Sequence, residues 1–432
     1  MISISILLSL VSLSFSQLRL EFTKKPSKYP EHNNIVVPVE IGTPPQRVPL
    51  SLEFFSTAIW VIDDECGDTV LANAKQIPFT PRLSSTYKNK PSALSKLYYT
   101  FNNGYHQVKA KQAIETINNI DKFDFFLARR FSGLEASSGV LGLDSNNVMF
   151  SSLAFRGYIS QLKDKGVINK EIFYIKYDDD TKGELVIGED PKGNSTSKIK
   201  YYRKDIDNHQ WRVKMNSVDY GNDVIEGDVF ADFKIELGVM IGNEFYYNAI
   251  KKYFFNEMLS KGKCFEYKIM NTEYYTFKCK DTKDTYKNFP PLTFEFDKDL
   301  NIQFTYEDLF QYDTNDINSD VKIFKVFFST KKKEDWTLGE PFFKKHILVF
   351  DSKDRAIGIM LLPSSFLDTV FKYKYYIIPS IILIPLFLFI ILHYIRRRQQ
   401  NQKKTKKAKG LIPITDMNTF YTDNEEELNE II

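Results

Sequence analysis

Residues 39–46 read VEIGTPPQ, and a second short run, AIWV, follows at residues 58–61. Further motifs lie downstream of them: FTPRLSSTY at 79–87, GVLGL at 139–143, QWRVKMNSVDYG at 210–221 and WTLGEPFFKKHILVFDSKDRAIG at 336–358. Short strand-like runs with Gly, Pro and Asn between them recur along the chain, which predicts an all-β architecture. Residues 153–165 and 244–260 have helical spacing instead. Residues 17–34 read as an extended lead-in.

Taken in order, these motifs resemble those of the pepsin-like aspartic peptidase family. The resemblance covers nearly all of the chain between two apolar terminal runs. It implies a bilobal pepsin-like acid protease fold, all-β with a few short helices, in which two lobes related by a pseudo-two-fold axis flank a cleft. We therefore expect an N-terminal lobe over residues 17–197 and a C-terminal lobe over residues 198–364.

Active members of this family carry an Asp-Thr/Ser-Gly loop in each lobe, and the two carboxylates share one proton. One carboxylate acts as a base on a bound water, and the other acts as an acid on the substrate carbonyl. Counting back from Trp60 places the first triplet on Glu53, Phe54 and Phe55, and only the next residue, Ser56, matches. A glutamate head group reaches about 1.5 Å further than that of aspartate, and a misplacement of about 1 Å can cost about a hundredfold in rate. Phe55 also fills a place kept for bare backbone.

The second triplet falls within residues 229–243, VFADFKIELGVMIGN, where three registers are open. One uses Glu236-Leu237-Gly238, which keeps a glycine. Another places Lys234 at the aspartate position and needs no gap, and a third begins at Asp232. None restores Asp-Thr-Gly or Asp-Ser-Gly. We therefore take Glu53 and Glu236 as equivalents of the catalytic pair, with Asp232 or Lys234 as alternatives for the second, and expect the site to be damaged.

Three further sites follow from the resemblance and from the chain's compartment. Tyr99 lies in LYYT at 97–100, which resembles the family's flap segment, so Tyr99 and Ser56 are candidate substrate-binding residues. The family often has a disulfide near residues 264–279, and we predict that Cys264 pairs with Cys279, which leaves Cys66 odd. Asn194-Ser195-Thr196 is a glycosylation acceptor.

Both ends of the chain indicate a membrane protein. Residues 1–16 read as a secretory signal peptide. Residues 375–395 form an uncharged apolar run of the length that crosses a bilayer as a helix, after a stalk at 365–374. The basic stretch that opens the tail at 396–432 predicts a cytoplasmic tail and a single-pass type I topology. We expect the ectodomain to be lumenal or extracellular, in the secretory pathway, at the plasma membrane or in an endosomal or vacuolar compartment.

Net charge and histidine spacing argue against several other functions. A net charge of +3 over 432 residues gives no case for nucleic-acid binding, and the five histidines form no His-x-x-x-His pair that would suggest a metal site. We expect no cofactor. Three functions stay open: a pseudopeptidase that binds peptide or protein in its cleft, an active membrane-tethered endopeptidase that uses a Glu-containing dyad at acidic pH, and a receptor or sorting protein that acts through its tail.

Overall fold

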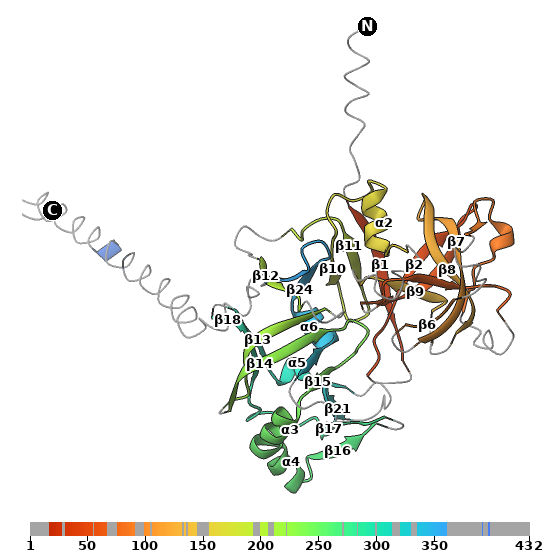
Figure 1. The fold of residues 1–432 in the computed structure, drawn as a ribbon. Helices are drawn as coiled ribbons and strands as arrows, with labels where there is room; N and C mark the ends of the chain where they lie inside the picture. Colours follow the sequence, from red (N-terminus) through yellow and green to blue (C-terminus); the bar gives the residue numbers. More distant parts are fainter. Residues whose placement is uncertain are drawn as a thin grey trace, which may run out of the picture. The chain divides into compact units, whose positions relative to one another are not determined.

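The computed structural model describes most of residues 17–360, together with Ile391, Arg396 and Arg397. Within 17–360 the residues outside the description are 28–30, 55, 67–75, 91–98, 104–105, 132–133, 135–136, 145–154, 193–198, 206–210, 222, 270–271, 283, 299, 313–319 and 330–334. The chain forms two compact units, Met1–Pro363 and Ser364–Ile432, and all elements named below belong to the first (Figure 1).

Several sequence predictions fall outside the described residues. The predicted signal peptide at 1–16, the acceptor Asn194 and the stalk at 365–374 are among them, as is the segment 375–395 apart from Ile391. None of the described helices is both long and apolar enough to cross a membrane.

The first sheet has 14 strands in the order β12-β25-β24-β10-β11-β1-β2-β3-β9-β4-β8-β7-β5, with β6 paired to β7. Its strands are β1 (Leu18–Lys25), β2 (Asn34–Ile41), β3 (Gln46–Glu53), β4 (Ile59–Ile62), β5 (Lys88–Asn89), β6 (Tyr99–Asn103), β7 (His106–Ile117), β8 (Ile120–Phe131), β9 (Gly139–Gly142), β10 (Ile172–Tyr177), β11 (Lys182–Ile187), β12 (Ile199–Arg203), β24 (Ile347–Asp351) and β25 (Ala356–Met360). Strands from both ends of the chain therefore meet in one sheet (Figure 1).

The second sheet has 11 strands in the order β19-β18-β13-β14-β23-β15-β22-β17-β21-β20, with β16 paired to β17. Its strands are β13 (Arg212–Asp219), β14 (Val224–Phe233), β15 (Met240–Gly242), β16 (Cys264–Lys268), β17 (Tyr274–Lys280), β18 (Leu292–Asp297), β19 (Leu300–Phe304), β20 (Phe310–Tyr312), β21 (Val321–Phe324), β22 (Val326–Ser329) and β23 (Trp336–Leu338). The prediction of a mostly β protein with few helices is confirmed.

The helices are short: η1 (Pro81–Leu83), α2 (Tyr158–Asp164), α3 (Glu244–Ile250), the π-helical η3 (Lys251–Phe255), α4 (Asn256–Ser260), α5 (Tyr306–Leu309) and α6 (Glu340–Lys345). The predicted helix at 244–260 is confirmed as α3, η3 and α4 in succession. It begins where the Asn243 side chain accepts a hydrogen bond from the Tyr246 N–H, the usual role of an N-cap asparagine. Phe245, part of the predicted apolar spacing, is instead 51% exposed.

The lead-in at 17–34 has a larger structural role than the sequence suggested. Residues 18–25 form β1, which lies between β11 and β2 in the interior of the first sheet. Leu20 and Phe22 are buried and alternate with polar residues, the pattern of a strand with one face on the core. The N-terminal strand is thus structural and not a spacer.

The predicted disulfide is confirmed. Cys264 on β16 and Cys279 on β17 are paired residues of adjacent strands and are bonded to each other. Cys66 is buried, and its thiol donates a hydrogen bond to the carbonyl oxygen of Arg129.

Replacing both Cys264 and Cys279 with serine should lower the free energy of unfolding by about 3 kcal/mol, because the bond closes a loop of 15 residues. Denaturant titration of the variant and the parent measures the change. Thiol alkylation of the denatured, unreduced parent should modify Cys66 alone, and modification of Cys264 or Cys279 in that sample would contradict the pairing.

Candidate functional site

Two loops with the same topology carry the candidate residues. Loop A, residues 53–58, follows β3, and loop B, residues 234–239, follows β14. Strand β9 lies between β3 and β4, parallel to the first and antiparallel to the second. Strand β23 lies in the same way between β14 and β15. In each case the chain therefore runs from one strand (β3 or β14) through the loop into a second strand (β4 or β15), and a third strand (β9 or β23) lies between the two.

Two glycines hold the loops at equivalent places. A Cβ atom on Gly142, the last residue of β9, would lie 2.3 Å from the carbonyl oxygen of Ser56, and one on Gly339, directly after β23, would lie 2.1 Å from that of Val239. Atoms cannot approach so closely, so only glycine fits at either position. The backbone of each loop is packed directly against the backbone of the strand that it surrounds.

The strand register decides which residues of the two loops correspond. Glu53 pairs with Gly142 between β3 and β9. Phe233 pairs with Leu338 between β14 and β23, and the N–H of the next residue, Lys234, donates to the carbonyl of Leu338 at 3.1 Å. Of the three registers left open by the sequence, this pairing favours the one without a gap. Glu236 lies two residues further along loop B.

Glu236 nevertheless interacts with Glu53. Both carboxyl oxygens of Glu236 are buried, although the residue as a whole is partly exposed. Burial raises the pKa of Glu236 to about 7; the Lys234 ammonium opposes this shift, and the negative charge of Glu53 adds to it. The N–H of Phe54 also favours the charged form. The carboxyl of Glu236 therefore lies against loop A, within electrostatic range of Glu53.

Phe54 takes the position where active family members have a threonine, and it belongs to the core. The side chain is 1% exposed. Its ring packs edge-on against Phe350 on β24 at 4.7 Å, Phe173 on β10 at 5.4 Å and Phe343 on α6 at 5.6 Å between ring centroids. Loop A is consequently anchored by aromatic packing beneath it, where the family would use a hydroxyl group.

The other predicted residues are placed less fully. Glu53 is 4% exposed and Ser56 is 1% exposed, and the Ser56 hydroxyl donates to the carbonyl of Ala58. Tyr99 begins β6, which pairs with β7; the position of its side chain lies outside the description, as do Phe55 and Tyr98. Asp232 lies within β14, where it pairs with Thr337. The grouping of Glu53 with Glu236 as a catalytic pair stays a prediction.

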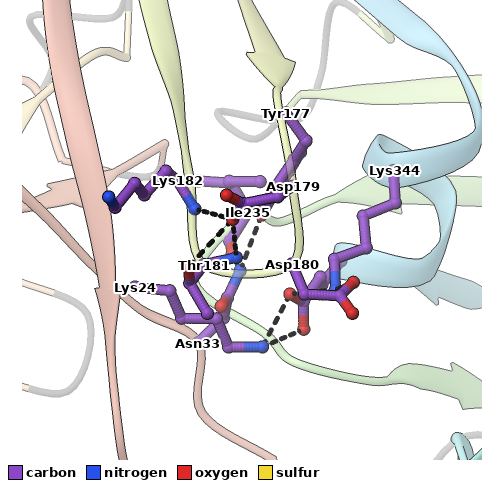
Figure 2. A network of polar contacts seen from close by, with 10 residues as sticks. Lys24, Asn33, Tyr177, Asp179, Asp180, Thr181, Lys182, Ile235 and Lys344 are labelled. Atoms are coloured by element: carbon purple, nitrogen blue, oxygen red, sulfur yellow. Dashed lines mark hydrogen bonds and ion pairs between the residues drawn. The ribbon is translucent and has the colours of Figure 1, made fainter.

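Polar contacts around loop B join distant parts of the chain (Figure 2). Lys24 on β1 donates to both carboxyl oxygens of Glu340 at 2.6 Å, and Lys344 lies 3.1 Å from the same carboxylate. Glu340 is fully buried and directly follows Gly339. A second buried ion pair joins Lys204 to Asp144 at 3.6 Å. Sequence reasoning missed these pairs, because nothing in the local sequence marks residues so far apart as partners.

The site combines the carboxyl groups of Glu53 and Glu236 with the ammonium group of Lys234, so it is neither a pair of carboxyl groups alone nor a simple ion pair. Burial is the main cause of the raised pKa of Glu236, and the negative charge of Glu53 is a smaller one. Lys234 adds an ammonium group at the end of β14, which stabilises the charged form of nearby carboxylates. Among the described residues no group of His, Cys, Asp and Glu could hold a metal ion.

Comparison with known proteins agrees with this topology. Residues 35–361 match the family described as Eukaryotic aspartyl protease, which is well over half of the chain. The chain belongs to the eukaryotic aspartyl protease family. Pepsin II-2/3 of Oryctolagus cuniculus is 27% identical over 195 residues, which is 43% of this chain and 48% of that protein. The chain thus matches about half the length of this relative.

Substituting Phe54 with alanine should lower the free energy of unfolding by about 3–5 kcal/mol, because a fully buried phenylalanine leaves a cavity among three other rings. Phe265→Ala is the matched control: Phe265 is 46% exposed, and its loss should cost about 1 kcal/mol or less. Denaturant titration compares the two. Equal effects would contradict the packing role assigned to Phe54.

Substituting Glu236 with glutamine should change how stability depends on pH. The folded pKa of about 7 lies above the ordinary value of 4.5, so the parent loses stability as pH rises from about 4.5 to 7 and is flat beyond. Glu236→Gln removes this loss, which amounts to at most about 3 kcal/mol. The free energy of unfolding of the variant should therefore rise relative to that of the parent as the pH increases from about 4.5 to 7.

Denaturant titrations at pH 4.5, 6 and 8 test this expectation, with the exposed Glu40→Gln as control. A difference between Glu236→Gln and the parent that stays constant over the three pH values would show that the carboxyl is not buried as described.

Proposed function

We propose that this chain is a membrane-anchored pseudopeptidase, a family member that binds an extended peptide or protein segment in its cleft without cleaving it. The observation that supports the proposal is the strand register: Glu53 ends β3 beside β9, and Lys234 directly follows β14 beside β23. We take these two residues, a glutamate and a lysine, as the equivalents of the two aspartates. Catalysis in the family needs two carboxylates that share a proton. An ammonium group carries its own proton and a positive charge, so it cannot replace the second carboxylate of a proton-sharing pair.

The packing of Phe54 supports the same conclusion. In active members a hydroxyl at this position helps to lock the two loops together, whereas here the side chain is buried against Phe173, Phe343 and Phe350. Loop A therefore keeps its place in the fold by contacts that serve stability alone. A fold preserved in this way can still present a cleft to a ligand.

A second candidate is an active endopeptidase that works at acidic pH with Glu53 and Glu236. The observation that favours it is the raised pKa of Glu236, to which the negative charge of Glu53 contributes, since a carboxyl that stays protonated at acidic pH can act as the acid of the reaction. Lys234, which lies within range of the Glu236 carboxyl, argues against it because it favours the charged form of that carboxyl, which cannot then act as the acid.

The membrane anchor and the compartment belong to the proposal as well. The apolar run at 375–395, followed by basic residues, supports a single span with a cytoplasmic tail. The Cys264–Cys279 disulfide fits a secreted or lumenal ectodomain, because disulfides persist in oxidising compartments.

The proposal is tested by assaying residues 17–363, the described compact unit without its signal segment, on denatured haemoglobin from pH 3 to 8. We expect no cleavage from folded protein, with or without pepstatin, and the same result for Glu53→Ala. Binding is then read by cross-linking of a photoreactive pepstatin-like peptide, which should label the protein.

Two outcomes would contradict the proposal. Cleavage that pepstatin blocks and that Glu53→Ala abolishes would establish the active endopeptidase instead. Absence of both cleavage and labelling would remove the cleft as the functional surface and leave the receptor or sorting role of the tail as the remaining candidate.

A further inference from the structure

A three-residue segment that precedes β2 is hydrogen-bonded to loop B. The N–H of Asn33 donates to the carbonyl of Glu236, and the N–H of Gly238 donates to the carbonyl of Glu31, both at 2.8 Å. His32 and Leu237 pair between them as an antiparallel bridge. Loop B is thus held by a segment from the far end of the chain, and the contact includes the backbone of Glu236 itself.

Asn33 makes most of this contact. It is 3% exposed, and its side-chain amide donates to the carbonyl of Ile235 at 2.9 Å and to the hydroxyl of Tyr177 at 3.1 Å (Figure 2). Both amide hydrogens therefore have acceptors. Together with its backbone N–H, Asn33 holds two consecutive carbonyl groups of loop B.

Tyr177, the second acceptor of the Asn33 side-chain amide, is held in place by packing. Tyr177 ends β10, and its ring packs edge-on against Phe22 of β1, with 5.2 Å between ring centroids. Burial raises the pKa of Tyr177 well above its ordinary value, so the hydroxyl stays neutral. Asn33 therefore links loop B to two strands in the interior of the first sheet.

We infer that Asn33 is a positioning residue for the candidate site: through its three hydrogen bonds it fixes Ile235 and Glu236, and so keeps the Glu236 carboxyl buried against loop A. The inference goes beyond the proposed function and holds whether the site binds a peptide or cleaves it. It assigns a functional task to a residue that lies in neither loop.

The physical consequence concerns solvent. The carboxyl of Glu236 meets the charges of Lys234 on its own loop and of Glu53 on loop A, but burial is the largest influence on its pKa. If the Asn33 side chain is removed, loop B loses one of its two bonds to Asn33, the one to Ile235, and the bond that ties Asn33 to Tyr177 is lost as well. The loop can then move, and water can reach the carboxyl. A hydrated carboxyl titrates near its ordinary value, so the titration of Glu236 reports directly on the positioning.

The test follows the carboxyl C=O stretch of the full-length chain in detergent by infrared difference spectroscopy against pH, with Glu236→Gln to assign the band. We expect a midpoint near 7 in the parent. Asn33→Ala should lower this midpoint by about one pH unit or more. Tyr177→Phe, which removes one acceptor and leaves the bond to Ile235, should lower it by a smaller amount.

Asn34→Ala is the matched control, because Asn34 is the adjacent residue and its side chain donates to the carbonyl of Pro26, away from loop B, at 3.5 Å. Its midpoint should equal that of the parent. A lower melting temperature of Asn33→Ala with an unchanged midpoint would overturn the inference and leave Asn33 a structural residue.

If Asn33→Ala does not fold, Tyr177→Phe decides the question alone: an unchanged midpoint overturns the inference and a lowered one supports it. These outcomes are independent of the haemoglobin assay, because the band is measured without a ligand or substrate.

Discussion

The close approach of Gly142 and Gly339 to the loops that surround them is the constraint on which the rest of the site depends. Gly142 lets β9 lie between β3 and β4, and Gly339 lets the chain after β23 continue between β14 and β15, with main-chain atoms of strand and loop in direct contact. This threading fixes where β3 and β14 end, and hence which side chains stand first in loops A and B. The chemistry of those side chains can change without disturbing the topology, because the constraint involves main-chain atoms only. Glu53, Phe54 and Lys234 are at positions where the side chain differs from the family pattern while the topology is kept.

The electrostatics of the site follow from that tolerance. Two carboxyl groups and one ammonium group lie where the family has two carboxyl groups, and burial makes every one of these charges costly unless it is compensated. The compensation is partly local, from Lys234 to Glu236. Elsewhere it comes from distant residues, as in the pair of Lys24 with Glu340 and that of Lys204 with Asp144. Burial outweighs the Asp144 carboxylate at Lys204 and lowers the pKa of that lysine.

The sequence predicted the family, the β architecture, the helix at 244–260 and the disulfide, because motifs, spacing and turn residues are local signals. It left the second register open, because Asp232, Lys234 and Glu236 differ by two residues each and only the pairing of β14 with β23 separates them. The interior position of β1 was not predicted, since three apolar residues in alternation are a weak signal. The Asn33 contacts and the Lys24–Glu340 pair join residues whose proximity arises from the complete fold, and no local pattern announces them.

The first sheet also sets a condition on how the chain is made. Strand β10 pairs with β24, with Ile172 opposite Asp351, and β12 pairs with β25. These edges stay open until the last strands have been synthesised, although most of the sheet is available much earlier. Contacts of such long sequence separation form slowly, and unpaired strand edges invite association with other chains. We therefore expect this protein to complete its first sheet only once residues 347–360 have been synthesised, and to depend on chaperones in the interval.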